Sequence, residues 1–175
     1  MQASVFWKTV TMDHADFLEE LVSLLAEHEV RYCVIGGQAV NAYVEPLVSL
    51  DLDLVVAVDQ LEFVAARLRG RFHVEEFPHS LNASMPGSDL RVRIQTDPRY
   101  LDFPQRASVR KVLGIPLPVA SLEDVLQGKI WAAMDPHRRA SKRRKDLLDI
   151  ERLLEKHPVL RDRVPAEILN RLSNS

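Results

Sequence analysis

Two aspartates two residues apart, Asp51 and Asp53, begin an apolar run that predicts a β-strand over residues 50–58. Alternate side chains of a strand share one face, so the two carboxylates point the same way, with α-carbons about 6.5–7 Å apart. Carboxylates placed in this way can bind one hard cation between them. Mg²⁺ prefers one or two carboxylates and takes its remaining ligands from water and phosphate oxygens. The pair therefore predicts a magnesium site with Asp51 and Asp53 as its protein ligands.

Two adjacent glycines, Gly36 and Gly37, follow a short apolar run that predicts a strand over residues 32–35. Glycine allows close approach of the backbone, and the start of the helix predicted over residues 38–44 offers free N–H groups to an anion. A tight turn would also explain the glycines. A phosphate-binding turn followed by a carboxylate pair, each attached to a buried strand, favours a triphosphate site of the kind that nucleotidyl transfer requires.

A lysine, Lys129, lies on the apolar face of the helix predicted over residues 121–134. Burial of an unpaired ammonium is costly, so Lys129 must reach a carboxylate, a phosphate or solvent. Asp146 lies on the packed face of the next predicted helix, over residues 138–156. An ion pair between Lys129 and Asp146 and a phosphate contact by Lys129 near the metal site are both consistent with this pattern.

A dense basic run begins the second of these helices. It could steer a nucleotide or an RNA acceptor through phosphate contacts, although a solvated helix face is the commoner explanation for such runs. No aromatic residues are interleaved with it, which argues against a platform for stacking single-stranded bases. The run consists of His137, Arg138, Arg139, Lys142, Arg143, Arg144 and Lys145.

The order of strand and helix patterns along the chain predicts an α/β fold, with a small mixed sheet, packed helices and a C-terminal helical segment. Residues 1–120 form the expected α/β core and residues 121–175 a helical segment packed on it, unless the two make one single domain. Further strands are predicted over 72–77, 90–95, 109–113 and 117–119. Further helices are predicted over 13–29 and 59–68, the second with a capping box of Asp59 and Glu62, and after Pro158. A loop is expected from Pro78 to Gly87.

Composition is that of an ordinary globular protein, with 175 residues, 46% of them apolar and 27% charged, and a formal net charge of −2. No apolar run approaches the roughly 18 residues of a membrane span. Acidic residues occupy the N-terminal region where a signal peptide would need an apolar stretch, so a cytoplasmic protein without membrane contacts is expected. The single cysteine, Cys33, is expected in the core.

The segment from residue 32 to residue 58 resembles the nucleotidyltransferase superfamily that includes DNA polymerase beta. The signature of that superfamily is Gly-Gly or Gly-Ser, a short helix, and then Asp-x-Asp on the next strand. The chain is more closely similar to minimal bacterial nucleotidyltransferases of the abortive-infection, type IV toxin–antitoxin kind, over residues 17–154. Those proteins carry a lysine and then a basic run ending in Lys-Asp, and Lys129 and Asp146 stand in the matching places.

This resemblance implies Mg²⁺-dependent transfer of a nucleoside monophosphate from an NTP to a hydroxyl of RNA, such as tRNA, or of a protein. A cognate antitoxin is the implied partner. In that mechanism Asp51 and Asp53 hold the metal, and the two glycines shape the phosphate-binding turn. Lys129 contacts the nucleotide and neutralises charge on its phosphates, while Asp146 orients Lys129 or assists the acceptor.

One departure from the superfamily pattern concerns a third carboxylate, usually present on a neighbouring strand. Mid-strand in residues 90–95, Arg93 and Gln95 stand in its place, and Asp89 and Asp97 flank the strand. An arginine there would pair with an aspartate of the metal site or hold a phosphate as a fixed cation. Alternative functions are therefore a catalytically degenerate module that binds nucleotides or proteins, and an RNA-binding protein that uses the basic helix.

Overall fold

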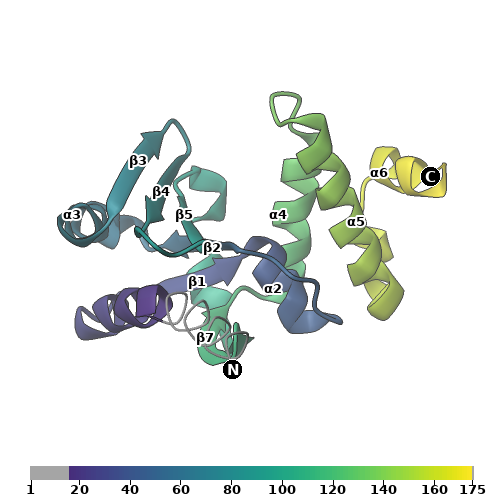
Figure 1. Cartoon of the computed structure of the whole chain (residues 1–175). Coiled ribbons are helices and arrows are strands. Elements are labelled where there is room, and N and C mark those ends of the chain that lie inside the picture. Colours follow the sequence, from purple (N-terminus) through teal and green to yellow (C-terminus); the bar gives the residue numbers. More distant parts are fainter. Residues whose placement is uncertain (1–15, 175) are drawn as a thin grey trace, which may run out of the picture.

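The structure of the chain is a computed structural model that describes residues 16–174. Its centre is one seven-stranded mixed sheet with the strand order β3-β4-β5-β2-β1-β7-β6. Figure 1 shows helices α4 and α5 side by side at one end of the molecule, with α6 beyond them. The strands are β1 Tyr32–Ile35, β2 Asp51–Val56, β3 His73–Phe77, β4 Ser80–Ser84, β5 Arg91–Gln95, β6 Ser108–Val112 and β7 Ile115–Val119.

The helices follow the predicted order along the chain. Residues 16–27 are helical, and the later helices are α2 Gly36–Tyr43, α3 Leu61–Arg71, α4 Leu122–Met134, α5 Ala140–Lys156 and α6 Ala166–Ser173. Short 3₁₀ helices occupy Val58–Gln60, Pro98–Tyr100, Phe103–Arg106 and Pro158–Arg163. None of the helices that the structure describes has the length and the apolarity needed to cross a lipid bilayer.

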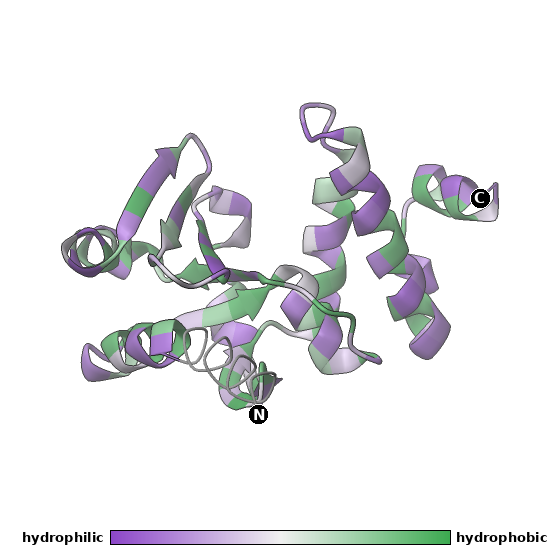
Figure 2. Ribbon diagram, in the orientation of Figure 1, coloured by the Kyte–Doolittle hydropathy of each residue, from purple (hydrophilic) through white to green (hydrophobic). Residues whose placement is uncertain are grey.

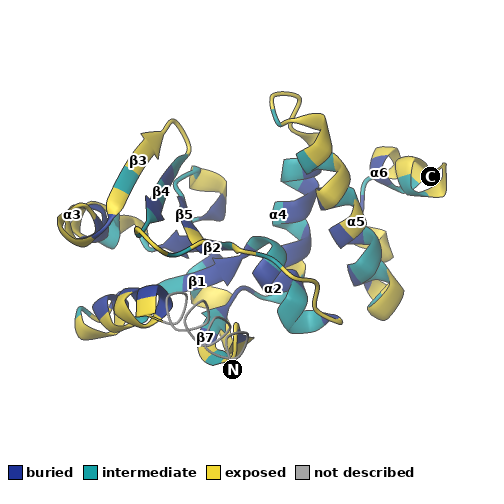
Figure 3. Cartoon of the chain, viewed as in Figure 1, coloured by how far each residue is buried: buried dark blue, intermediate teal, exposed yellow. Residues whose placement is uncertain are grey.

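Strand β2 is the strand that carries the two aspartates, and it lies between β1 and β5. It pairs antiparallel with β1 and parallel with β5, so the sheet is mixed as predicted. Leu52 and Leu54 of β2 are buried on one face, while the aspartates stand on the other. Figure 3 shows that buried residues concentrate in the central strands and in α4, whereas β3 is largely exposed.

One hydrophobic core joins the sheet to helices from both the N-terminal and the C-terminal half of the sequence. Hydrophobic residues gather along the central strands, and hydrophilic residues cover the outer face of α5 (Figure 2). Helix α2 contacts both α4 and α5. Cys33 is fully buried in this core, as predicted, and burial raises the pKa of its thiol to about 12.

Helix α4 begins where the sequence predicted, because the Ser121 hydroxyl accepts a hydrogen bond from the Asp124 N–H at 3.2 Å. The capping box predicted for α3 is wrong. A 3₁₀ turn over Val58–Gln60 precedes the helix, so Asp59 lies outside it and forms an ion pair with Arg31 instead.

Other boundaries also differ from the predictions, and one cannot be compared. The expected loop from Pro78 to Gly87 contains strand β4, in which Leu81 and Ala83 are buried alternately. Helix α5 begins at Ala140, which leaves Arg138 in the preceding turn, after Pro136 has ended α4. The N-terminal helix was predicted from residue 13, and residues 13–15 lie outside the described part.

Candidate functional site

Asp51 and Asp53 line one cavity of about 150 Å³ at the open face of β2. We call it the basic cavity, because six cationic and three acidic side chains line it. Gly37, Ser49 and Asn82 are also in its wall. The charged residues that line it are Asp51, Asp53, Arg91, Arg93, Lys129, Arg138, Lys142, Lys145 and Asp146.

The two glycines form the first turn of α2 rather than a turn that precedes it. Gly36 has φ +70°, a conformation that favours glycine, and a Cβ at this position would lie 2.5 Å from Asp53 Oδ2. A side chain at Gly36 would therefore displace the Asp53 carboxylate. A Cβ at Gly37 would meet no atom within 4 Å, so the space beside it is open to a ligand.

The two aspartates have different electrostatic surroundings. Asp51 forms an ion pair with Arg91 Nε at 2.8 Å. Asp53 has no ion pair within the described residues, and burial raises its pKa against the opposing charges of Arg93 and Lys129. An ionised Asp53 therefore lacks a direct counter-charge among residues 16–174, and a bound cation would supply one.

Lys129 reaches both carboxylates of α5. The side chain is only 7% exposed, and its Nζ lies 3.1 Å from Asp146 Oδ1 and 2.8 Å from Asp149 Oδ2. Burial lowers the pKa of Lys129, but the two carboxylates outweigh this effect and raise it, so the ammonium stays charged. Arg138 Nε also donates to Asp146, at 2.6 Å. The predicted Lys129–Asp146 pair is present and lies in the wall of the basic cavity.

Sequence reasoning did not single out Asp149, which is as buried as Asp146, at 1% exposure. Arg152 completes this cluster, since its Nη1 lies 2.8 Å from Asp149 Oδ1 and its Nη2 donates to the backbone oxygen of Glu45. The signal was present in the sequence, because Asp149 follows Asp146 by one helical turn on the same packed face.

A second, smaller cavity of about 60 Å³ lies beside Asp53, and we call it the inner cavity. Tyr100 lies in its wall, and a Cβ at Gly128 would come within 3.2 Å of the Tyr100 ring, so Gly128 gives α4 its close approach to this tyrosine. Burial raises the pKa of Tyr100 to about 12. The inner cavity shares five lining residues with the basic cavity: Asp53, Arg93, Lys129, Arg138 and Asp146.

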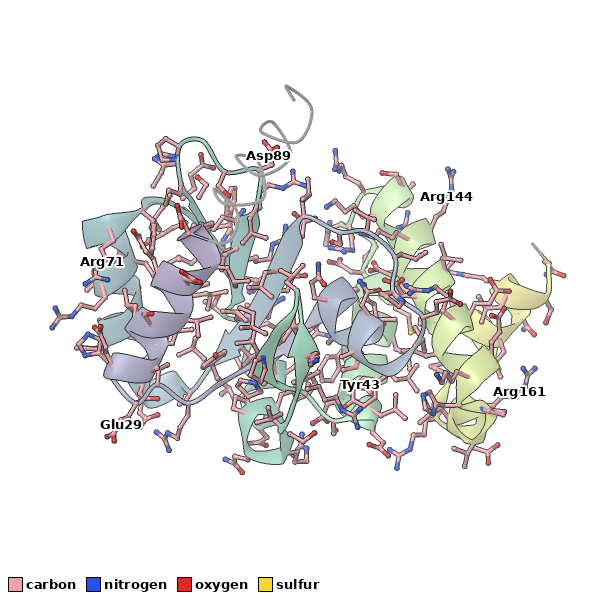
Figure 4. All side chains as sticks on the ribbon, turned by 60° about the horizontal axis from the view of Figure 1, so that its bottom comes forward. Glu29, Tyr43, Arg71, Asp89, Arg144 and Arg161 are labelled. Carbon is pink, nitrogen blue, oxygen red and sulfur yellow. The ribbon has the colours of Figure 1, made fainter. Side chains whose placement is uncertain are left out.

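Strand β5 places arginine where the superfamily pattern has a third carboxylate. Arg93 is the register partner of Asp53 on β2 and of Asn82 on β4. The flanking acids do not replace that carboxylate, because neither Asp89 nor Asp97 lines either cavity. Asp89 is exposed and lies at the surface (Figure 4). Asp97 pairs with Arg99 at 2.9 Å, and that contact lowers its pKa.

The basic run divides between the cavity and solvent. Arg138, Lys142 and Lys145 line the basic cavity, whereas Arg139 and Arg144 are exposed. Figure 4 shows Arg144 pointing away from the molecule. The exposed members fit a solvated helix face, and phosphate contacts by the members that line the cavity stay a prediction.

The donor set fits one Mg²⁺ ion shared with a substrate rather than a cage built by the protein alone. Asp51 and Asp53 supply two carboxylates on one face, and Gly36 leaves room for Asp53 Oδ2 beside the backbone. Within residues 16–174 the structure has no group of three or more His, Cys, Asp or Glu side chains suited to hold a metal. Remaining ligands would come from water and phosphate.

Comparison with protein families places this arrangement in a known group. The model of the nucleotidyl transferase AbiEii toxin family, of type IV toxin–antitoxin systems, matches residues 35–174. The chain belongs to this family. The matched residues of this AbiEii family member include both glycines, both aspartates of β2, Lys129 and Asp146. Membership assigns the chain to nucleotidyl transfer in general. A comparison with curated proteins found no match.

Solved structures agree with this AbiEii assignment at the level of the fold. The antibiotic-resistance factor ANT(2″)-Ia is 16% identical, with a TM-score of 0.54 over 87% of this chain and 93% of that one. The lincomycin-bound lincosamide antibiotic adenylyltransferase LnuA is 13% identical, with a TM-score of 0.51 over 78% and 95%. An antigenic nucleotidyltransferase-like protein from Paracoccidioides brasiliensis is 18% identical, with a TM-score of 0.51 over 85% and 76%.

Proposed function

We propose that this AbiEii family member transfers a nucleoside monophosphate from an NTP to a hydroxyl of RNA or protein, in a Mg²⁺-dependent reaction, as the toxin of a type IV system with a cognate antitoxin. The single observation that carries the proposal is the convergence of Asp51, Asp53 and Lys129 on the basic cavity. Carboxylates for a cation and cations for a polyphosphate meet there in one wall, which is the arrangement that phosphoryl transfer needs.

The reaction forms a bond between the acceptor oxygen and the α-phosphorus and breaks the bond from that phosphorus to the bridging oxygen of the β-phosphate. Pyrophosphate leaves with the electron pair, and the proton of the acceptor hydroxyl passes to solvent. Asp51 and Asp53 would hold a magnesium ion, which would neutralise charge on the phosphates. Lys129 neutralises charge on the same phosphates. Asp146 orients Lys129, a role supported by their contact at 3.1 Å.

The test is a thermal-shift titration with ATP, GTP, CTP and UTP, with and without Mg²⁺, on the wild type and on Asp51→Asn. A ligand that binds only the native state raises the melting temperature by mass action. At a ligand concentration of 100 times Kd, the free energy of unfolding increases by about 2.7 kcal/mol. We expect one NTP to give a Mg²⁺-dependent shift that Asp51→Asn abolishes. No shift with any NTP in folded wild-type protein would refute the proposal.

A degenerate, non-catalytic module is the second candidate, and two observations favour it. Arg91 Nε forms an ion pair with Asp51 at 2.8 Å. Arg93, rather than a carboxylate, lies in register with Asp53. A module of this kind keeps a partner protein when Asp51 becomes asparagine, whereas an enzyme loses transfer. Co-purification of a partner with Asp51→Asn, together with unchanged NTP binding, would favour the module.

A further inference from the structure

Two arginines of β5 line the basic cavity, and they differ in exposure and in ion pairing. The Arg91 side chain is 71% exposed and already pairs with Asp51. Arg93 is half-buried, and among residues 16–174 the structure records neither an ion pair nor a side-chain hydrogen bond for its guanidinium. A guanidinium cannot lose its charge in a protein, so Arg93 is a permanent cation for which the described residues supply no direct partner.

Metal binding would increase this imbalance rather than relieve it. The carboxylate nearest to Arg93 in the sheet register is Asp53, which is one of the two candidate metal ligands. A divalent cation bound to Asp53 would neutralise the carboxylate charge that otherwise balances the charge of Arg93. An anionic ligand must then supply the counter-charge, and a phosphate oxygen matches the planar donor fork of arginine.

The position of Arg93 indicates which phosphate this is. A transfer reaction brings a donor and an acceptor to one phosphorus atom, which must lie where their two spaces meet. Arg93 is in the shared wall of the basic and inner cavities. Its neighbour in register, Asn82, has a buried Oδ1 without a hydrogen-bond partner in the described residues, and a hydroxyl beside the phosphate would donate to it.

We propose that Arg93 binds a non-bridging oxygen of the α-phosphate, the group that is transferred. The unpaired guanidinium at the junction of the two cavities, in register with a metal-site carboxylate, carries this inference, which rests on the proposed function. Arg93 thus places a fixed positive charge on the β5 side of the reacting phosphorus, beside the carboxylate of Asp53.

The test measures binding to wild type, Arg93→Gln, Arg93→Lys and the control Arg71→Gln, by calorimetry with Mg²⁺. The ligands are the NTP that the thermal-shift titration selects, its NMP and pyrophosphate. Arg71 ends α3, is exposed and lines neither cavity. Figure 4 shows its side chain at the edge of the molecule. We expect Arg93→Gln to weaken NTP and NMP binding by roughly 10- to 100-fold, and to leave pyrophosphate binding unchanged.

A second measurement separates this role from structural damage. Mn²⁺ alone, without nucleotide, should bind Arg93→Gln more tightly than wild type, because a positive charge beside Asp53 has been removed. A damaged site would bind both Mn²⁺ and the nucleotides more weakly. Arg93→Lys keeps the charge without the donor fork, and we expect a loss of roughly 3- to 10-fold for NTP and NMP. This variant decides the matter if Arg93→Gln does not fold.

Three outcomes overturn the inference while the proposed function stands: unchanged NMP and NTP affinity, equal weakening of pyrophosphate, and weaker Mn²⁺ binding in Arg93→Gln. Each of them requires that wild-type protein binds the NTP. Failure of the wild type to bind any NTP would instead refute the proposed function, and the role of Arg93 with it. Arg71→Gln should match the wild type with every ligand.

Discussion

Asp53 shows how the candidate site sets function against stability at a single residue. Its carboxylate stands in a confined space beside Gly36, and no residue of the described chain pairs with it directly. Burial therefore makes the ionised form costly in the metal-free protein. Functional sites commonly carry such a cost, and replacements that remove it stabilise the fold while they abolish activity.

Asp53→Asn should stabilise the metal-free protein, and the gain should grow with pH. A carboxyl whose pKa is raised on folding binds its proton more tightly in the native state. The wild type therefore loses stability as pH rises from the ordinary pKa of 3.8 toward the raised value. Thermal melts in EDTA from about pH 4 to about pH 7 should show a growing advantage of Asp53→Asn, of about 1 kcal/mol at neutral pH.

The control for this prediction is Asp16→Asn, an exposed carboxylate on the first helix. It should melt with the wild type at each pH. A wild-type protein that gains stability over Asp53→Asn as pH rises would contradict the prediction, because it would mean that the folded chain stabilises the charged carboxylate.

At the scale of elements, α5 is fastened to the rest of the fold through buried charge. Asp149 pairs with Lys129 of α4 and with Arg152 of its own helix. Arg152 in turn donates to the backbone oxygen of Glu45 and to Asn41 Oδ1, both at the end of α2 or just after it. The segment that leads into Asp51 is therefore held by the same cluster that positions Lys129.

Asp149→Ala should reduce the free energy of unfolding by about 3 kcal/mol, because it leaves two buried cations with less negative charge. Urea unfolding followed by circular dichroism measures this loss. The matched control is Glu167→Ala, which removes an exposed pair with Arg171 in α6 and should cost at most about 1 kcal/mol. Equal losses in the two variants would contradict a fastening role for Asp149.

Residues whose position depends on one element were predictable from the sequence. Asp51 and Asp53 follow the two-residue period of a strand, Lys129 interrupts the apolar face of a helix, and Ser121 precedes that helix as a cap. The mixed sheet and the helical C-terminal part were confirmed for the same reason. The mid-strand position of Arg93, where a carboxylate was sought, was also located correctly.

Residues whose role depends on contacts between elements were not predictable. The sequence predicts a loop at Asn82, because Pro78, Pro86 and Gly87 lie around it. Asn82 instead lies in β4, a strand that is defined by its pairing with β3 and β5. Asp149 lay in a plain amphipathic pattern, and its partner Lys129 comes from another helix. The sequence predicts Asp59 as a helix cap, but its carboxylate forms a tertiary ion pair with Arg31.

At the scale of the whole molecule, the candidate site draws on both parts of the chain. The carboxylates of β2 precede residue 121, and Lys129 and Asp146 follow it. Trp131 of α4 also packs on residues before that point, with its ring 5.1 Å from Tyr100 and stacked at 6.0 Å on Phe103. We propose that the α/β core and the helical segment form one cooperative unit.

This proposal predicts a single unfolding transition. Trp7→Phe leaves Trp131 as the one tryptophan of the chain, so its fluorescence reports on the contact between the two parts. Urea curves from that fluorescence and from far-UV circular dichroism should coincide, as two-state behaviour requires. Two separated transitions would show instead that residues 121–175 come apart from the core as an independent domain.

The order of these parts along the chain has a consequence for biosynthesis. A ribosome makes the glycine turn and the Asp-x-Asp strand first, and then the helices α4 and α5 that bring Lys129 and Asp146. At about 5–20 residues per second, the 35 residues from Leu122 to Lys156 take roughly 2–7 s to synthesise. During that interval the nascent chain lacks Lys129 and Asp146, so the basic cavity is complete only after α5 has been synthesised.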